Sequence, residues 1–219
     1  TPEAIKVTLG IDKHVPVAGG MGGGSADAAA ALVAVNQLLG TALSDEKLHE
    51  LAAELGSDVP FALTGGAAIG LGKGDRLTAV EGVAPIHLVL VFDDQGLSTP
   101  QVYKRLDELR ASRDEQIDAP EINRNILRAL QNGNPFEIAE LLHNDLEEAA
   151  LSLRPDLRIK MTTLLQHGAI RAMVSGSGPT IIGLASSEVA AEQIARSLRE
   201  LGYNAISTSG PAVGTKLSE

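Results

Sequence analysis

The spacing of hydrophobic and polar positions predicts a chain that mixes strands with helices. Residues 5–11 alternate with β-branched side chains and residues 86–92 form a short apolar run, so each stretch predicts a strand. Helix-forming residues predict helices at 26–39 and 45–55. The later part of the chain predicts helices near 122–131, 135–146, 157–167 and 188–201, a strand pair around 175–178, and an extended end at 204–207. This order indicates the α+β class.

Glycine and proline mark the ends of these elements. Ser25 is a candidate N-cap for the helix at 26–39, and Gly56 suits a left-handed residue that ends the helix at 45–55. The glycines of 70–75 predict a hairpin turn with Lys73 in solvent. The stretch 82–85 is the predicted domain boundary, which divides the chain into lobes at 1–84 and 85–219.

Charge and cysteine content exclude several classes of function. The chain has 219 residues with 18 Lys and Arg against 28 Asp and Glu, a formal net charge of −10. Such a surface repels phosphate backbones and anionic lipid, so we expect neither nucleic-acid nor membrane binding. The absence of cysteine excludes disulfides and thiol chemistry and fits a reducing compartment. No apolar run approaches the roughly 20 residues of a membrane span. We expect a soluble, cytoplasmic protein.

Five glycines occupy the six positions from 19 to 24, between a predicted strand and a predicted helix. Backbone N–H groups converge on phosphate oxygens only where side chains leave room, and a helix N-terminus adds a partial positive charge. The segment therefore predicts a phosphate loop. A glycine-rich turn that merely packs strand against helix is the alternative.

Three known phosphate-binding patterns do not fit this loop. A Walker A loop requires Lys followed by Ser or Thr after Gly24, where the chain has Ser25 and Ala26. A dinucleotide fingerprint requires Gly or Ala at position 25. The signatures of protein kinases are also absent from the sequence.

Asp27 is expected in the first turn of the helix, where its carboxylate would repel a bound phosphate. A divalent cation would screen the two groups or be shared between them, so we infer Mg²⁺. The five histidines lack the spacing of a metal-binding pair, and the metal ligands stay unassigned.

Asp58 lies beside Pro60 directly after a predicted helix end. A carboxylate in a rigid turn suits the acceptance of a hydroxyl proton during phosphoryl transfer, although a plain Asx turn is the alternative. The Ser-Gly-Ser-Gly string at 175–178 predicts a hairpin turn, and beside the first loop it suggests a second glycine element packed against the phosphate site.

Three strings carry a resemblance to a known family: residues 16–29, with Gly-Gly-Met-Gly-Gly-Gly-Ser at their centre; residues 55–61, Leu-Gly-Ser-Asp-Val-Pro-Phe; and residues 175–180, Ser-Gly-Ser-Gly-Pro-Thr. Together with the Asn-Asp-Leu-Glu string at 144–147, they resemble the kinases named after galactokinase, homoserine kinase, mevalonate kinase and phosphomevalonate kinase. The extra glycines and the Gly-Ser-Asp-Val-Pro-Phe string are most similar to the branch whose substrate is a cytidyl diphosphate sugar alcohol of non-mevalonate isoprenoid synthesis.

The resemblance implies an incomplete first lobe like domain 2 of ribosomal protein S5 and a ferredoxin-like second lobe. It also implies ATP-dependent, Mg²⁺-assisted phosphorylation of a hydroxyl on that substrate, with Asp58 as the base. The residues it implies for ATP binding are Pro16, Val17, Ala18, Gly19, Gly20, Met21, Gly22, Gly23, Gly24, Ser25 and Ala26.

The family carries a longer N-terminal segment with a catalytic lysine, to which no residue here corresponds; Lys13 is not at the equivalent place. Because the chain begins at Thr1, we expect a fragment that is inactive or very poor alone. Two alternatives stay open: the same scaffold acting on another small alcohol, and a nucleotide-binding module without chemistry. Oligomeric state is not indicated.

Overall fold

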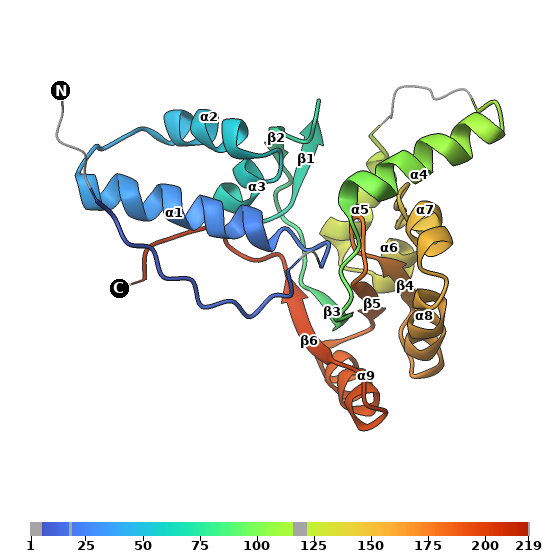
Figure 1. Cartoon of the computed structure of the whole chain (residues 1–219). Helices are drawn as coiled ribbons and strands as arrows, with labels where there is room; N and C mark the ends of the chain where they lie inside the picture. Colours follow the sequence, from blue (N-terminus) through green and yellow to red (C-terminus); the bar gives the residue numbers. More distant parts are fainter. Residues whose placement is uncertain (1–5, 18, 116–121, 219) are drawn as a thin grey trace.

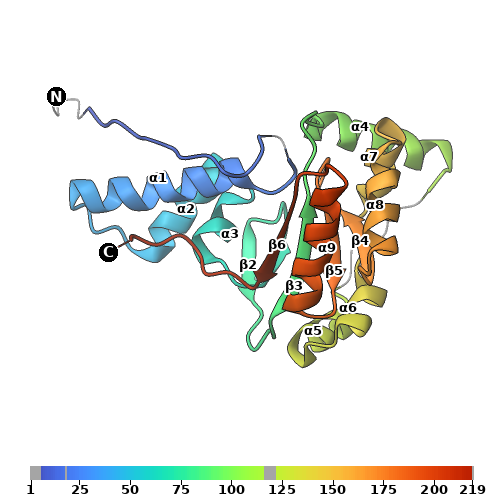
Figure 2. The ribbon, with the colours of Figure 1, turned by 90° about the horizontal axis from the view of Figure 1, so that it is seen from below.

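The computed structural model describes residues 6–17, 19–115 and 122–218, which form two groups of elements lying side by side (Figures 1 and 2). The first group contains α1 (Gly23–Leu39), α2 (Asp45–Leu55), α3 (Val59–Thr64), β1 (Ala68–Leu71) and β2 (Arg76–Ala79). The second contains β3 (Ile86–Val91), α4 (Thr99–Ser112), α5 (Arg124–Asn132), α6 (Pro135–Leu141), α7 (Glu147–Leu153), α8 (Leu157–Gln166), β4 (Arg171–Val174), β5 (Ile181–Ala185), α9 (Glu188–Glu200) and β6 (Ala205–Gly210). The predicted boundary at 82–85 lies in the connection between β2 and β3.

The ends of the first two helices show how local signals act. The prediction of Ser25 as N-cap is wrong, because α1 begins three residues earlier than expected, at Gly23, after Gly22 with φ 62°. The Ala26 N–H then donates the first helical hydrogen bond to Gly22 O, at 2.9 Å. Helix α2 has the predicted bounds, and the Ser44 side chain accepts from its first turn. Gly56 ends it with extended backbone, φ 172°, so the predicted left-handed residue there is also wrong.

The predicted strand at 5–11 does not form in residues 6–11, and Ile5 lies outside the described part of the chain. These residues run beside α1 without joining either sheet (Figures 1 and 2). Their pattern suits a strand, and the Ile11 side chain is 63% exposed. A strand exists only where a neighbour pairs its backbone N–H and C=O groups, and no described segment does so here.

The second group is built on a four-stranded antiparallel sheet in the order β4-β5-β3-β6. With α8 before β4 and α9 before β6, this is the strand order of a ferredoxin-like fold, as predicted. Alternation along β3 sends Val89 and Val91 to one face, where Leu164 of α8 and Ile194 of α9 complete a large aliphatic core. Helices α5 and α6 cover the other face over a smaller cluster.

Several elements of the second group differ from the prediction. Helices α4 and α7 were not predicted, and the helix expected at 135–146 ends at Leu141. Residues 142–146 instead form an irregular link before α7. In the first group, α3 was also missed, whereas the hairpin at 70–75 forms as predicted between β1 and β2, with Lys73 exposed.

After β6 the chain returns to the first group and contacts α3. Gly66 N–H donates to Ala212 O at 2.7 Å, and both the N–H and the hydroxyl of Thr215 donate to Ala62 O at 3.0 Å. The C-terminal segment therefore holds the short helix that follows Asp58. Among the described residues, no helix combines the length and apolarity needed to cross a bilayer.

Candidate active site

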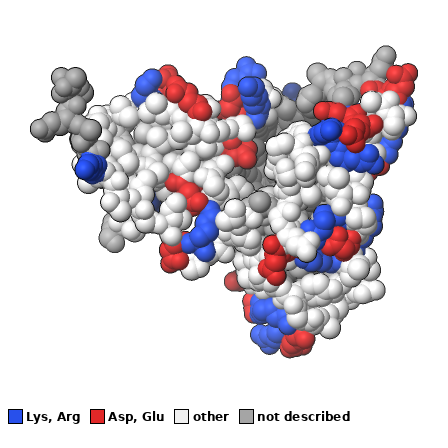
Figure 3. Space-filling model, in the orientation of Figure 1, with Lys and Arg blue, Asp and Glu red and all other residues white. Residues whose placement is uncertain are grey.

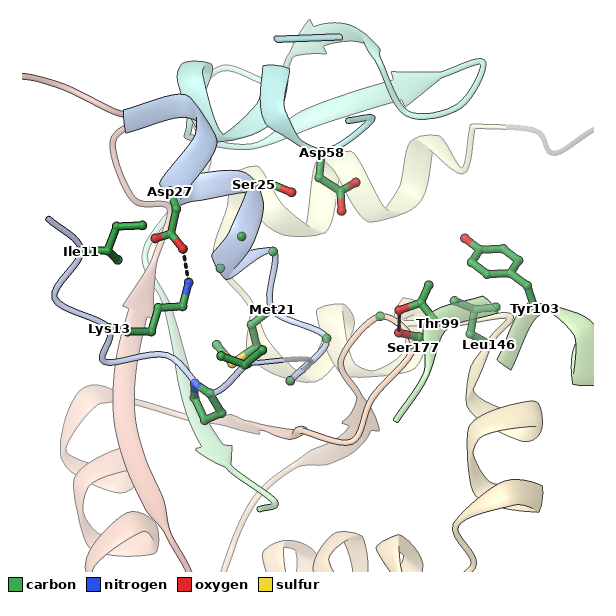
Figure 4. Close-up of a pocket in the computed structure, with 18 residues that line it drawn as sticks. Ile11, Lys13, Met21, Ser25, Asp27, Asp58, Thr99, Tyr103, Leu146 and Ser177 are labelled. Carbon is green, nitrogen blue, oxygen red and sulfur yellow. Dashed lines mark hydrogen bonds and ion pairs between the residues drawn. The ribbon is translucent and has the colours of Figure 1, made fainter. Parts of the chain in front are cut away.

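The residues singled out in the sequence gather around a cavity of about 780 Å³ at the junction of the two groups (Figure 4). The first group contributes the glycine loop, defined as residues 19–24, together with Ser25 and Asp58. The second group contributes the turn at 175–178 through Gly176 and Ser177. The remaining lining residues are Ile11, Lys13, Pro16, Val17, Asp27, Thr99, Tyr103 and Leu146. Ala26 does not line the cavity and Ala18 lies outside the described residues.

The N-terminus of α1 opens onto this cavity without a side-chain cap. Helices α2, α5, α6 and α9 are each capped by a Ser or Asn side chain. In α1 the N–H groups of residues 23–25 precede the first intrahelical hydrogen bond, so they are free to bind an anion. A Cβ at Gly22 or Gly24 would meet no atom within 4 Å, so there is open space for an anion beside these N–H groups.

Gly20 has a different role, because it allows close packing. Its φ is 72°, and a Cβ there would lie 2.3 Å from Ser175 O and 2.7 Å from Gly178 O. The Ser175 hydroxyl also donates to Gly20 O at 2.8 Å. The second glycine element therefore packs against the loop, as predicted, and it also forms the hairpin between β4 and β5. The close-packing alternative therefore holds for Gly20, and the phosphate loop stays a prediction for the glycines that line open space.

The negative charge of Asp27 is balanced within the site. Its carboxylate pairs with the Lys13 ammonium, and the two side chains are 31% and 28% exposed. Because α1 begins at Gly23, Asp27 lies beyond the first turn in which it was expected. The inference of Mg²⁺ from an unbalanced Asp27 therefore rested on a wrong premise, since a lysine 14 residues earlier supplies the opposite charge.

Asp58 occupies the N-cap position of α3 but makes no capping hydrogen bond with its side chain. The helix begins at Val59, and Pro60 favours this start because its fixed φ suits the first turn. Val59 and Pro60 are buried while Asp58 is exposed. In Figure 4 the Asp58 carboxylate and the Ser25 hydroxyl lie on the same side of the glycine loop. The plain Asx-cap alternative is not what the structure shows.

Part of the wall contributed by the second group, namely Thr99, Tyr103 and Leu146, was missed in the sequence. Thr99 Oγ1 and Ser177 Oγ are hydrogen-bonded at 2.8 Å, and Tyr103 and Leu146 lie beyond them (Figure 4). Ser98 and Pro100 flank Thr99 at the start of α4, and this pattern is a helix-start signal that could have been recognised.

Acidic and basic side chains are interspersed over the face shown in Figure 3. The formal net charge is −10, so the long-range field of the chain opposes a polyphosphate. Binding of a polyphosphate at this cavity would therefore depend on local groups, chiefly the N–H groups at the start of α1.

Family models match both groups of elements. The model of the GHMP kinases N terminal domain matches residues 3–66, and that of the GHMP kinases C terminal domain matches residues 126–204. The fold and the two family models together assign the chain to the GHMP kinases.

Curated relatives define the branch. The chain is 49% identical over 215 residues to the 4-diphosphocytidyl-2-C-methyl-D-erythritol kinase of Pseudarthrobacter chlorophenolicus, covering 98% of this chain and 67% of that protein. It is 47% identical to the kinase of the same name from Nocardia farcinica, covering 96% of this chain and 69% of that protein. The chain belongs to the family of 4-diphosphocytidyl-2-C-methyl-D-erythritol kinases. It spans about two thirds of the length of these relatives.

Solved structures show the same fold. A crystal structure of 4-(cytidine 5'-diphospho)-2C-methyl-D-erythritol kinase aligns with a TM-score of 0.74 at 32% identity, covering 90% of this chain and 68% of the other. Homoserine kinase from Cytophaga hutchinsonii aligns with a TM-score of 0.69 at 19% identity, covering 92% and 68%, and this likeness concerns the fold alone.

Proposed function

We propose that this chain carries the ATP site and the catalytic base of a kinase that phosphorylates the 2-hydroxyl of 4-diphosphocytidyl-2-C-methyl-D-erythritol in non-mevalonate isoprenoid synthesis. One observation carries the proposal. The uncapped N-terminus of α1, the glycine loop and the Asp58 carboxylate, which makes no capping hydrogen bond, line the same cavity. Family membership, and the name shared by the relatives, supports the choice of substrate.

Each part of the reaction has a group suited to it. The N–H groups at the start of α1 bind the terminal phosphates of ATP and offset their charge. Asp58 accepts the proton of the substrate hydroxyl while the oxygen of that hydroxyl forms a bond to the γ-phosphorus of ATP. The bond from that phosphorus to the bridging oxygen breaks, and ADP leaves with the electron pair. Phosphoryl transfer requires little beyond this alignment and charge neutralisation.

Mg²⁺ fits the same cavity through its oxygen donors. The Ser25 hydroxyl lines it, and Mg²⁺ in kinases is held by one or two protein oxygens together with substrate phosphates. When bound, the ion neutralises phosphate charge. Among the described residues, no group of three or more His, Cys, Asp or Glu side chains could hold a metal ion.

Replacing Asp58 with Asn tests the proposal, in protein expressed from its whole coding sequence. We expect kcat to fall about 10²–10⁴-fold, because the amide cannot accept the proton. The dissociation constant for ATP should stay nearly unchanged, since Asp58 does not form the phosphate loop. Asp107→Asn, at an exposed position of α4, is the matched control.

Three outcomes decide between the candidate functions. Near-normal turnover by Asp58→Asn would show that Asp58 is not the base. Binding of ATP without transfer to any small alcohol by the wild-type protein would indicate a nucleotide-binding module. Transfer to another alcohol in preference to the cytidyl substrate would keep the chemistry and change the assigned substrate.

A further inference from the structure

The glycine loop rests on the turn at 175–178, so the position of that turn determines the position of the loop. The contact is made largely by backbone atoms, since Gly20 lies against Ser175 O and Gly178 O. The Ser175 hydroxyl adds one hydrogen bond to Gly20 O. Backbone atoms in contact cannot move independently, so a displacement of the turn displaces the N–H groups that follow Gly20.

The side chain of Asn144, in the irregular link between α6 and α7, holds the turn at 175–178 in place. Its Nδ2 donates to Val174 O at 2.9 Å and to Gly176 O at 2.8 Å. Its Oδ1 accepts from Leu146 N–H at 3.0 Å. Both partners of Nδ2 are carbonyls, which only accept, so the orientation of the amide is unambiguous. Asn144 is half-buried and uses both ends of its amide.

Glu147 completes the attachment of the turn. Its Oε2 accepts from Val174 N–H at 2.9 Å. Val174 ends β4, which in the described sheet pairs with β5 and leaves its other edge open. Side chains of the 144–147 segment thus bind the N–H and the C=O that an edge strand would otherwise leave unpaired. This also explains why the helix predicted over 135–146 is interrupted there.

We propose that Asn144 is a positioning residue for phosphate binding, acting through the turn at 175–178 and Ser175 on the glycine loop. The inference rests on the proposed function, because it takes the glycine loop as the phosphate site. Asn144 does not line the cavity, so it acts only through these contacts. Without its two donated hydrogen bonds the Gly176 carbonyl is released, and the N–H groups at the start of α1 lose their common direction.

The sharpest variant is Asn144→Asp, tested by calorimetry with inorganic tripolyphosphate and Mg²⁺ in protein expressed from its whole coding sequence. Aspartate keeps the acceptor for Leu146 N–H but sets a carboxylate oxygen against two carbonyls. We expect the dissociation constant for tripolyphosphate to rise about 10-fold, or roughly 1.4 kcal/mol. Asn123→Asp is the matched control, because Asn123 caps α5 through its oxygen and aspartate caps equally well.

A second variant and a double-mutant cycle separate positioning from general destabilisation. Asn144→Ser retains one donor without the repulsion, so we expect a smaller loss, and it carries the test if Asn144→Asp does not fold. Ser175→Ala removes the hydrogen bond to Gly20 O. If Asn144 acts through Ser175, the 10-fold effect of Asn144→Asp shrinks in the Ser175→Ala background; residues that act through one path are not additive.

Three results would overturn the inference. The first is unchanged tripolyphosphate binding in the Asn144 variants while the wild type binds. The second is an equal loss in both backgrounds, which would indicate a structural role alone. The third is a wild-type chain that binds neither tripolyphosphate nor ATP, and this would remove the phosphate site and the proposed function as well.

Discussion

Replacement of Gly20 with Ala measures how firmly the two groups of elements are joined at the active site. The new Cβ would lie 2.3 Å from Ser175 O, where ordinary contacts are 3.4–4 Å. The obstructing atoms are backbone, which cannot swing aside as the end of a side chain would. Two separate effects therefore lower the free energy of unfolding of the variant, a strained φ of 72° and a steric clash.

The two effects have different sizes and a control that separates them. A left-handed conformation costs a residue with a Cβ about 1–2 kcal/mol, and overpacking costs about 1–3 kcal/mol. The sum for Gly20→Ala is about 2–5 kcal/mol. Gly40, which ends α1, has φ 59° and nothing within 4 Å of a Cβ, so Gly40→Ala should cost only the first amount.

Urea unfolding of both variants and the wild type gives the difference directly. We expect Gly20→Ala to lose more of the free energy of unfolding than Gly40→Ala, by about 1–3 kcal/mol. We also expect only Gly20→Ala to weaken the binding of tripolyphosphate, since Gly40 is at the far end of α1. Equal losses of stability in the two variants would refute the argument that the glycine loop and the turn at 175–178 are too closely packed to accept a Cβ at position 20.

Two further predictions concern Gly24, where a side chain would meet open space, and Asp93, whose carboxylate is largely buried. Gly24→Ala should stabilise α1 by up to about 1 kcal/mol, because its Cβ meets nothing, yet weaken tripolyphosphate binding measured by calorimetry, because the methyl group enters the anion space. Burial opposes ionisation of Asp93, but hydrogen bonds and charge from Lys160 and Arg154 prevail and hold its pKa below the ordinary value. A lowered folded-state pKa contributes stability that is present above the unfolded value of about 4 and is lost as pH falls through the folded value. The stability advantage of the wild type over Asp93→Asn, measured by urea unfolding at pH 7, 5 and 3, should therefore shrink on the acid side; an advantage independent of pH would contradict this.

Local signals predicted the features that local physics decides. Helix α2 has its predicted bounds because Ser44 satisfies its first turn and the intervening residues favour a helix. The glycine loop and Asp58 were singled out because phosphate binding and proton transfer need particular residue types, and the structure brings them to one cavity. The pattern at 6–11 failed for the opposite reason, since pairing depends on a neighbouring strand rather than on the residues themselves.

The unpredicted parts of the site depend on residues far apart in the sequence. Nothing in the string around Asp27 indicates that Lys13 neutralises it, because the pair forms only through the path of the chain. The need for glycine at position 20 comes from Ser175, and the hydroxyl of Thr99 meets Ser177, 78 residues further along, only when the second group folds. Periodicity and caps contain no information on such contacts.

The dependence of the glycine loop on a distant turn has a consequence for synthesis on the ribosome. Gly20 and Ser175 are 155 residues apart, and Thr215 binds the helix after Asp58 from 153 residues further along. At about 5–20 residues per second, the glycine loop waits roughly 8–30 s between its own translation and that of the turn on which it rests. Until then Gly20 has nothing to lie against, so the first group of elements cannot complete this loop by itself, however early its helices form.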